Sequence, residues 1–296
     1  MNPIIILGPT ASGKTKLSID LAKQLDAEII SADSMQVYRE MDIGTAKPTK
    51  EERQGIPHRL IDIKNPDEEW TVSDFVEQTN NLTTEQPNKQ FLIVGGTGLY
   101  LWTLLNGYSF PLAPADKTIR ERLEKLSPAT LYTQLSTIDP LAAQKIHPNN
   151  KKRIVRALEV YELTGKPISQ QQKRGHSTSH IAPSTVIGLK LEREELYKRI
   201  NARVDIMIEK GLIEEIKGLL DKNYSKKLPS MQGLGYKEVV EYLDGNWDKD
   251  KMIYELKKRT RHFARRQLTW FRRFEEAKWF ASPVDTSLVL DYIDNI

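Results

Sequence analysis

The stretch Gly8-Pro9-Thr10-Ala11-Ser12-Gly13-Lys14-Thr15 decides the fold class of this 296-residue chain. It matches the pattern G-x-x-x-x-G-K-[ST] and lies between an apolar run, Ile4–Leu7, and a segment with helical spacing, Lys14–Leu25. In a strand-loop-helix context the backbone N–H groups point inward at an anion, and the helix N-terminus adds positive potential. The stretch therefore predicts a P-loop that binds a diphosphate or triphosphate. Lys14 would reach the terminal phosphate oxygens, and the Thr15 hydroxyl would help to hold Mg²⁺.

Strand-like and helical patterns alternate around this loop. Strands are predicted at Ile4–Leu7, Glu28–Ala32, Arg59–Ile63, Phe91–Val94 and Thr185–Leu191, and helices at Lys14–Leu25 and Val72–Leu82. Such alternation is typical of an α/β fold in which a parallel sheet carries helices on both faces. We therefore expect a P-loop NTPase-like α/β core.

The pattern changes to mostly helical after Pro111 and Pro114. We predict a helical insertion domain over residues 115–184, placed within a core formed by residues 1–114 and 185–296. Its clearest helix is capped by Asn149 or Asn150 and ends at Gly165. Further helices are predicted at Ile119–Leu126, Ala129–Ile138, Leu196–Lys210, Ile213–Leu220, Tyr236–Leu243 and about Lys249–Phe274.

Composition narrows the class of protein. Hydrophobic residues make up 39% and charged residues 28% of the chain, as in soluble globular proteins. No apolar run approaches the ~18 residues of a membrane span, and no leader sequence is recognised, so we expect a cytoplasmic protein that does not bind membranes. The lack of cysteine excludes disulfides, zinc fingers and thiol catalysis. We expect a monomer.

Basic residues gather in two segments although the net charge is only +4. Lys257–Arg273 contains eight Lys or Arg and no acidic residue, and a second cluster comprises Lys151, Lys152, Arg153 and Arg156. Stripes of this kind are typical of surfaces that bind phosphate backbones, and also of solvated helix faces.

One carboxylate is missing where an ordinary P-loop NTPase has one. The predicted strand Phe91–Val94 runs into Gly95-Gly96-Thr97-Gly98-Leu99-Tyr100, without the Asp that would hold Mg²⁺. Asp33 follows the strand Glu28–Ala32 instead. Because ligands of open α/β sheets bind at the carboxyl ends of the strands, Asp33, Thr97 and the P-loop are expected to converge on one cleft.

Eight ordered motifs resemble the bacterial tRNA dimethylallyltransferases across almost the whole chain. Beyond the P-loop they are Ser31-Ala32-Asp33-Ser34-Met35-Gln36-Val37-Tyr38, Met41-Asp42-Ile43-Gly44-Thr45-Ala46-Lys47-Pro48, Pro57-His58-Arg59-Leu60-Ile61-Asp62, Gly95-Gly96-Thr97-Gly98-Leu99-Tyr100, Arg153-Ile154-Val155-Arg156-Ala157-Leu158-Glu159, Gln232-Gly233-Leu234-Gly235-Tyr236-Lys237-Glu238 and Arg265-Arg266-Gln267-Leu268-Thr269-Trp270-Phe271. A P-loop alone is shared by many functions, whereas this ordered set is much more specific.

The resemblance implies transfer of a dimethylallyl group from dimethylallyl diphosphate to N6 of the adenine just 3′ of the tRNA anticodon, with release of diphosphate. Asp33 would be the general base. Lys14, Mg²⁺ on Thr15, and Arg203 would stabilise the leaving group. Thr97 would position the adenine or the diphosphate.

The resemblance also implies contacts with the anticodon stem-loop. The flipped nucleotide would be contacted by Asp33, Ser34, Met35, Gln36 and Thr97. Within the predicted insertion, the residues expected to contact tRNA are Arg120, Lys152, Arg153, Ile154, Val155 and Arg156. The stripe Lys257–Arg273 is a further candidate surface for the stem.

Other functions fit parts of the sequence. In a small-molecule P-loop kinase, Asp33 would be either the base for a hydroxyl or a ligand of Mg²⁺. A third alternative is that Asp33 only caps a helix. Thr97 would fit a tight turn, and Arg203 a solvated helix face. A non-catalytic RNA-binding protein and a prenyltransferase acting on free AMP-type nucleotides are further alternatives. The P-loop permits ATP binding, although ATP is not the expected substrate.

Overall fold

The computed structural model describes residues 1–107, 113, 115–171 and 185–296 of the chain. They form two compact units, Met1–Leu105 with His180–Ile296, and Asn106–Ser179. The predicted insertion domain, residues 115–184, overlaps the second unit. Within the described ranges, no helix combines the length and apolarity needed to cross a membrane.

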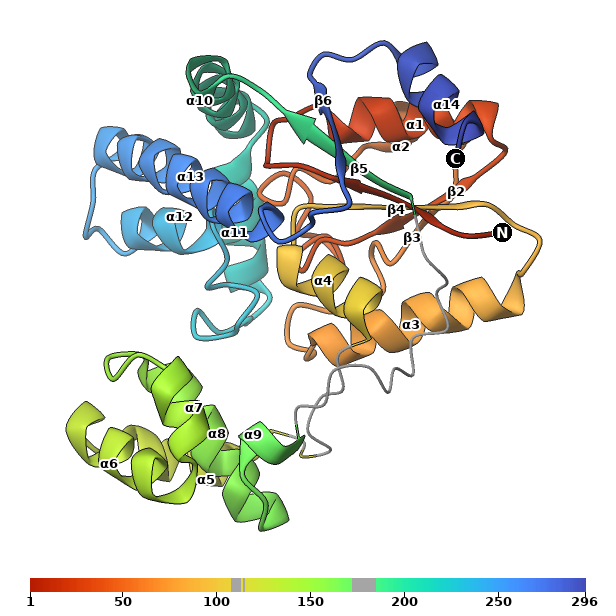
Figure 1. The fold of residues 1–296 in the computed structure, drawn as a ribbon. Coiled ribbons are helices and arrows are strands. Elements are labelled where there is room, and N and C mark those ends of the chain that lie inside the picture. Colours follow the sequence, from red (N-terminus) through yellow and green to blue (C-terminus); the bar gives the residue numbers. More distant parts are fainter. Residues whose placement is uncertain (108–112, 114, 172–184) are drawn as a thin grey trace. The chain divides into compact units, whose positions relative to one another are not determined.

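A six-stranded parallel sheet organises the first unit (Figure 1). Its order is β3-β2-β4-β1-β5-β6, which places the strand before the P-loop between two others near the middle. The strands are β1 (Ile4–Leu7), β2 (Glu28–Ser31), β3 (His58–Arg59), β4 (Phe91–Gly95), β5 (Thr185–Lys190) and β6 (Lys278–Ala281). Ile4 pairs with Leu92 of β4 and with Thr185 of β5. Because all neighbours are parallel, the carboxyl ends of β1, β2 and β4 meet at one edge.

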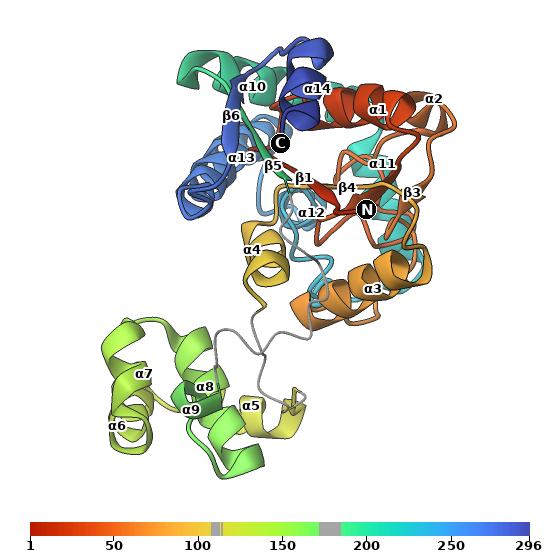
Figure 2. The same cartoon turned by 45° about the vertical axis from the view of Figure 1, so that its right-hand side comes forward.

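Helices cover both faces of the sheet, as the alternating sequence pattern predicts. Figures 1 and 2 show α1 (Lys14–Gln24) and α14 (Thr286–Asp294) on one face, and α3 (Val72–Glu85) and α4 (Gly98–Asn106) on the other. Side chains along β1 alternate between these faces because a strand has a period of two. The α/β class predicted from the sequence is confirmed.

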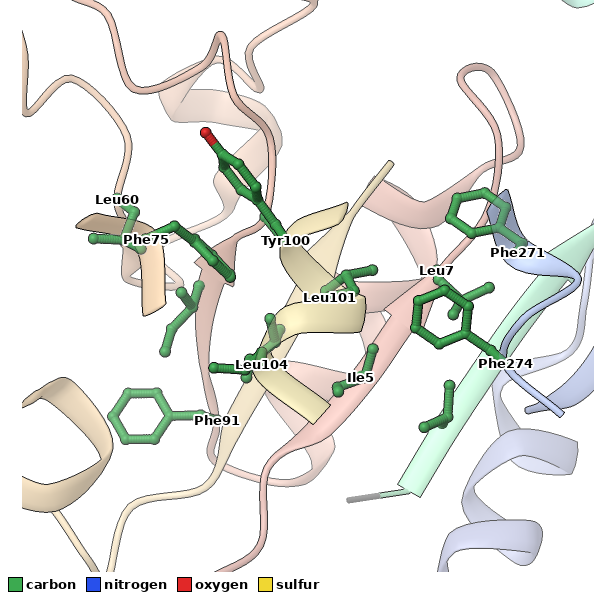
Figure 3. Packing of buried hydrophobic residues seen from close by; sticks show 14 residues of the cluster. Ile5, Leu7, Leu60, Phe75, Phe91, Tyr100, Leu101, Leu104, Phe271 and Phe274 are labelled. Carbon is green, nitrogen blue, oxygen red and sulfur yellow. The ribbon is translucent and has the colours of Figure 1, made fainter. Parts of the chain in front are cut away.

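The two faces of β1 belong to two different cores. Ile5 and Leu7 pack with α4 through Leu101 and Leu104, as Figure 3 shows. Ile4 and Ile6 pack with α1 and α14 in the opposite core. Every β1 side chain is buried, so the strand that leads into the P-loop is held firmly on both sides.

Four helices lie at the end of the sheet toward which the strands run (Figure 1). They are α10 (Arg193–Glu209), α11 (Leu212–Asp221), α12 (Tyr236–Leu243) and α13 (Lys249–Phe271). A core formed by these helices also includes Val37, Tyr38 and Met41 from the segment after β2. The short helix α2 (Lys50–Arg53) follows that segment and begins with a capping box at Thr49. The helices therefore build the wall that faces the strand ends.

The second unit consists of α5 (Lys117–Glu124), α6 (Pro128–Ile138), α7 (Pro140–Lys145), α8 (Lys151–Thr164) and α9 (Ile168–Gln171). Its core lies among α5, α6, α7 and α8. Asn150 caps the start of α8 through the Arg153 N–H, and Gly165 ends it in the left-handed conformation, with φ of 68°. Both ends agree with the sequence prediction.

Several elements differ from the sequence prediction. The strand predicted at Arg59–Ile63 ends at Arg59, because Leu60 and Asp62 adopt φ of 62° and 58° in the left-handed region, which an extended strand does not use. Helix α4 and the last two elements, β6 and α14, were not predicted. Helix α13 ends at Phe271, slightly earlier than predicted.

Candidate active site

The P-loop crosses from the buried end of β1 to the first residue of α1. Gly13 adopts φ of 91°, a left-handed conformation that disfavours a side chain. The Lys14 ammonium donates to the carbonyl oxygens of Gly8 at 2.8 Å and Pro9 at 2.9 Å. The Lys14 side chain thus folds back over the P-loop, within reach of an anion bound by the loop amides.

A cleft at the carboxyl ends of the strands gathers most of the predicted site residues. Its lining includes Thr10, Lys14 and Thr15 of the P-loop, Asp33, Ser34, Met35 and Gln36 after β2, Thr97 after β4, and Arg203 of α10. Ala11, Ser12 and Gly13 line an adjoining hollow together with Lys14 and Thr15. The structure therefore brings together the segments that the sequence predicted to converge.

Asp33 is the carboxylate at the centre of this arrangement. Its Oδ1 accepts hydrogen bonds from the backbone N–H of Met35 at 2.8 Å and of Gln36 at 3.4 Å. Burial raises the pKa of Asp33 above its usual value, against the opposing effect of these two bonds and of the Lys14 charge. Among the described residues, no protein group donates a hydrogen bond to the second carboxylate oxygen, so this atom is available to a substrate.

Thr97 is held next to Asp33 by the turn between β4 and α4. Its N–H donates to the Ala32 carbonyl at 3.3 Å, and its hydroxyl oxygen accepts from the Ser34 N–H at 3.3 Å. Gly95 lies against Ala32 so closely that an added Cβ would come within 2.2 Å of the Ala32 oxygen. The glycine thus lets the strand ends of β2 and β4 approach, which brings Thr97 and Asp33 together.

Two cations face the cleft with little compensating negative charge. Arg203 Nη1 lies 3.5 Å from the Thr10 hydroxyl oxygen. Burial, and next the charge of Arg203, lower the pKa of Lys14 to about 7, although the Asp33 carboxylate opposes this. A shift of this size means that the site disfavours the charge on Lys14 until an anion balances it. A bound diphosphate would supply that anion.

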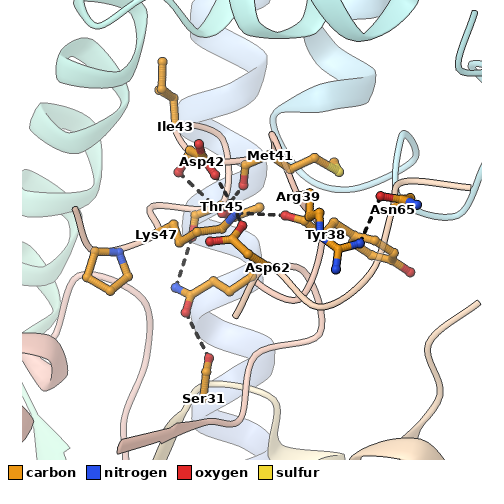
Figure 4. Close-up of polar contacts among 12 residues, drawn as sticks. Ser31, Tyr38, Arg39, Met41, Asp42, Ile43, Thr45, Lys47, Asp62 and Asn65 are labelled. Carbon is orange, nitrogen blue, oxygen red and sulfur yellow. Dashed lines mark hydrogen bonds and ion pairs between the residues drawn. The ribbon is translucent and has the colours of Figure 1, made fainter. Parts of the chain in front are cut away.

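The segment after β2 is fixed by a buried lysine (Figure 4). Lys47 Nζ contacts the Tyr38 carbonyl at 2.8 Å, Asp42 Oδ1 at 2.5 Å and Asp62 Oδ1 at 2.6 Å. From the start of this segment, the Gln36 side chain accepts from the Ser31 hydroxyl at 2.9 Å. The segment therefore presents a rigid wall to the cleft.

The sequence did not predict the roles of Glu215, which supports the segment after β2, and of Gln267, which lines the cleft. Glu215 of α11 accepts from the N–H groups of Asp42, Ile43 and Gly44 at 2.9, 2.7 and 3.1 Å, and from the Tyr236 hydroxyl at 2.7 Å. Gln267 of α13 bonds to the P-loop and to the turn that carries Thr97. The signal for Gln267 was its polar side chain on the otherwise mostly apolar buried stripe of α13.

The residues present fit a magnesium ion that arrives with a diphosphate. Thr15 is exposed in the cleft and offers its hydroxyl. No group of three His, Cys, Asp or Glu suited to a metal occurs among the residues with described positions. Mg²⁺ typically combines one or two protein oxygens with substrate phosphates and water, so a single Thr15 ligand is compatible with it.

The residues of the second unit that were predicted to contact tRNA lie in different surroundings. Ile154 and Val155 are buried in the core of that unit. Arg120 and Arg156 both bind the buried carboxylate of Glu159, at 2.8 and 2.7 Å. Burial raises the pKa of Glu159, but hydrogen bonds from Arg156, the Asp116 N–H and Arg120 outweigh it and give a net lowering.

The two remaining candidates on this unit are differently placed. Lys152 and Arg153 are exposed on the first turn of α8, and no ion pair involves either of them within the described ranges. Their charges are thus free for a phosphate, whereas Arg120 and Arg156 are occupied in holding the fold of the unit.

Comparison with known proteins agrees with this geometry. A family model described as IPP transferase matches residues 36–274. The tRNA dimethylallyltransferase of Pelotomaculum thermopropionicum is 48% identical over 281 residues, which are 93% of this chain and 89% of that protein. The tRNA dimethylallyltransferase of Carboxydothermus hydrogenoformans is 50% identical over 285 residues, or 94% and 91% of the two chains.

Solved structures give the same result. The full-length tRNA isopentenylpyrophosphate transferase of Bacillus halodurans matches with a TM-score of 0.72 and 45% identity, covering 99% of this chain and 94% of that one. A eukaryotic dimethylallyltransferase acting on tRNA matches with a TM-score of 0.81 and 30% identity, over 100% and 80% of the two chains. The ordered motifs, the P-loop cleft and these matches together show that the chain belongs to the IPP transferase family.

Proposed function

We propose that this protein transfers the dimethylallyl group of dimethylallyl diphosphate to N6 of the adenine just 3′ of the tRNA anticodon. The observation that carries the proposal is the single cleft that unites a P-loop, Asp33, Thr97 and Arg203 in a chain of the IPP transferase family. The N6–carbon bond forms, the carbon–oxygen bond to diphosphate breaks, and the N6 proton leaves to a base.

Asp33 is the base in this proposal. An exocyclic adenine amino group is a weak nucleophile because its lone pair is delocalised into the ring. A carboxylate that accepts its hydrogen bond and then its proton strengthens it. Asp33 is suited to this role, since two backbone N–H groups fix one of its oxygens. Its raised pKa also favours proton acceptance. Thr97 and Gln36 orient the adenine ring within the cleft.

The P-loop holds the departing diphosphate. Negative charge grows on the bridging oxygen as the allylic carbon–oxygen bond breaks, and fixed positive groups stabilise that charge. Lys14, Arg203 and the loop amides are these groups. Thr15 would hold Mg²⁺, which when bound would add positive charge at the diphosphate oxygens. The monomeric state and the cytoplasmic location stay predictions.

The adenine must leave the anticodon-loop stack to enter such a cleft. The phosphate backbone of the tRNA around this adenine would be bound by exposed Lys and Arg side chains. In α13, Lys257 pairs with Asp205, Lys258 with Glu255, and Arg259 with Glu238 and Glu255. Within the described chain no ion pair engages the exposed Arg265 and Arg266. We therefore propose that the basic stripe contacts the stem through its exposed arginines that have no ion pair in the described chain, of which Arg265 and Arg266 lie within α13. Lys152 and Arg153 of α8 are a separate candidate surface on the second unit.

The salt dependence of tRNA binding tests that surface. Replacing both Arg265 and Arg266 with alanine should reduce the slope of log affinity against log salt by about 1.4–1.8, since each phosphate contact contributes roughly 0.7–0.9. The matched control is Lys258→Ala in the same helix, which removes a cation already paired with Glu255 and should leave the slope unchanged. Equal slopes for the wild type and the double variant would exclude this surface.

The pH profile of kcat/KM for dimethylallyl diphosphate should be bell-shaped. On the acid side activity falls as the pH drops through the raised pKa of Asp33, because the protonated carboxyl cannot accept a proton. On the alkaline side it falls as the pH rises through about 7, where free Lys14 loses the charge that attracts the diphosphate. Steady-state rates between pH 5 and 9 measure both limbs.

A lysine-to-arginine change separates the two limbs of that profile. Arginine stays protonated throughout this range, so Lys14→Arg should lose the alkaline limb and keep the acid limb. Its overall rate will be lower, because the larger guanidinium does not fit the loop as the ammonium does. An alkaline limb that persists unchanged in Lys14→Arg would show that another group controls it.

A comparison of three candidate acceptors identifies the substrate that receives the prenyl group. With labelled dimethylallyl diphosphate, unmodified tRNA should become labelled, whereas AMP should not. A tRNA with guanine in place of the adenine 3′ of the anticodon should also stay unlabelled, because guanine lacks the 6-amino group. Transfer to AMP would favour a nucleotide prenyltransferase, and transfer from γ-labelled ATP to a small acceptor would favour a kinase.

A further inference from the structure

The Gln267 side chain joins two loops of the cleft that are far apart in sequence. Its Oε1 accepts a hydrogen bond from the Thr10 N–H of the P-loop at 2.8 Å. Its Nε2 donates to the Gly96 carbonyl at 3.0 Å, in the turn between β4 and α4. The side chain comes from α13, is only 5% exposed and lines the cleft. One amide thus bridges the two loops.

Only a side chain with both a donor and an acceptor can make this bridge. The Thr10 N–H requires an oxygen, and the Gly96 carbonyl requires an N–H, so the two partners also fix the orientation of the amide. The bridge requires close approach as well. An added Cβ at Gly96 would come within 2.2 Å of Gln267 Nε2, which explains a glycine at this position.

The two bridged loops carry the two halves of the proposed reaction. Thr10 lies on the diphosphate side, where its hydroxyl is 3.5 Å from Arg203. Gly96 precedes Thr97, whose hydroxyl oxygen accepts from the Ser34 N–H next to Asp33. Bond formation requires the allylic carbon and the adenine nitrogen to meet at close range, so the spacing between these loops sets the reacting distance.

We propose that Gln267 is a positioning residue that holds the P-loop and the Thr97 turn at the spacing required for prenyl transfer. This role rests on the proposed function, because it concerns the distance between the two substrates of that reaction. Gln267 touches neither reacting atom in the proposal. It acts through Thr10 on the bound diphosphate and through Gly96 and Thr97 on the adenine.

Replacement of Gln267 by leucine tests the bridge. Leucine is similar in size but leaves the Thr10 N–H and the Gly96 carbonyl without their partner. We expect kcat for transfer to tRNA to fall by about 10- to 100-fold, as for other misplacements near an angstrom. KM for dimethylallyl diphosphate should rise. The control in the same helix is Thr269→Ala, which should behave as wild type. The exposed Thr269 hydroxyl donates to the Arg265 carbonyl and has no other hydrogen bond among the described residues.

Binding of inorganic diphosphate with Mg²⁺, measured by calorimetry without tRNA, separates this proposal from the proposed function. Gln267→Leu should weaken that binding because the P-loop loses an anchor. If the wild type fails to transfer a prenyl group, the proposed function is wrong, but weaker diphosphate binding by Gln267→Leu would still show that Gln267 anchors the loop. If Gln267→Leu keeps wild-type kcat, KM and diphosphate affinity, and only its melting temperature falls, the residue is structural and the positioning role is overturned.

A double-variant cycle with Gly96→Ala gives a second measurement that tolerates partial loss of stability. Alone, Gly96→Ala should impair transfer strongly because the new methyl group collides with the Gln267 amide. In a Gln267→Ala background the same change should cost much less, since the colliding atoms are gone. Additive losses in kcat would contradict the bridge.

Discussion

Replacing Asp33 with asparagine is expected to lower kcat by about 10²- to 10⁴-fold, the usual contribution of a general base. Asparagine keeps the shape of the side chain, and its oxygen can still accept the N–H groups of Met35 and Gln36 that hold the carboxylate. The segment after β2 should therefore keep its conformation. What the variant loses is the ability to take the N6 proton. Single-turnover transfer with saturating substrates measures this loss directly.

Two further measurements show whether the loss is chemical. The affinity of Asp33→Asn for tRNA should stay close to that of the wild type, because the backbone contacts that shape the cleft remain. Asp26→Asn is the matched control, since Asp26 is an exposed carboxylate paired with Lys89 at 3.0 Å. A normal rate in Asp33→Asn would disprove the base assignment, and a large loss of tRNA affinity would point to a binding role instead.

Replacing Lys14 with methionine should lower kcat/KM for dimethylallyl diphosphate by about 10²- to 10³-fold, as loss of one fixed donor to a developing anion does elsewhere. Methionine preserves most of the length and the apolar stem while removing the charge. Arg203 and the loop amides remain, so some diphosphate binding persists. The burial that lowers the pKa of Lys14 to about 7 will also make the neutral side chain easy to accommodate, so the fold should be retained.

The effect should fall on the diphosphate and spare the RNA. In Lys14→Met, KM for tRNA should change little, and inhibition by inorganic diphosphate should weaken in parallel with KM for the prenyl substrate. Lys23→Met, near the end of the same helix α1, is the control because Lys23 is remote from the P-loop start of that helix. A variant that loses tRNA affinity and keeps diphosphate inhibition would contradict the assignment of the P-loop to the leaving group.

The phosphate side of the site was predictable because it is local in sequence. Eight consecutive residues between a strand and a helix specify the P-loop, and Asp33 and Thr97 each follow a strand that ends at the same sheet edge. The parallel arrangement of β1, β2 and β4 then forces these residues together. Fold class and convergence on one cleft follow from local patterns combined with one topological rule.

Contacts between distant segments were not predictable in the same way. The pair Thr10 and Gln267 is separated by 257 positions, and only the packing of α13 against the strand ends brings them together. Arg203 has the periodicity of a solvated helix residue, yet α10 starts directly after β5, beside β1, and the side chain reaches the cleft. Its place was expected from family resemblance alone.

Local patterns also misjudged some elements. Helix α4 begins at Gly98, a poor helix former, so the Gly-rich turn hid its start. Gly98 is needed there because an added Cβ would come within 2.7 Å of Trp270 in α13. In the second unit, Arg153 and Arg156 belong to the same motif but differ in surroundings. Arg156 pairs with the buried carboxylate of Glu159, whereas Arg153 is an exposed surface cation, and the sequence alone does not reveal this difference.

A doubly labelled prenyl donor tests the central claim most directly, namely that the P-loop of this chain holds a departing diphosphate while an adenine of tRNA accepts the carbon. Dimethylallyl diphosphate would carry ¹⁴C in the prenyl group and ³²P in the diphosphate, and would be incubated with unmodified tRNA and Mg²⁺. We predict that ¹⁴C enters the adenine 3′ of the anticodon while an equal amount of ³²P appears as free diphosphate. Phosphorus in the RNA, or carbon absent from it, would contradict the account.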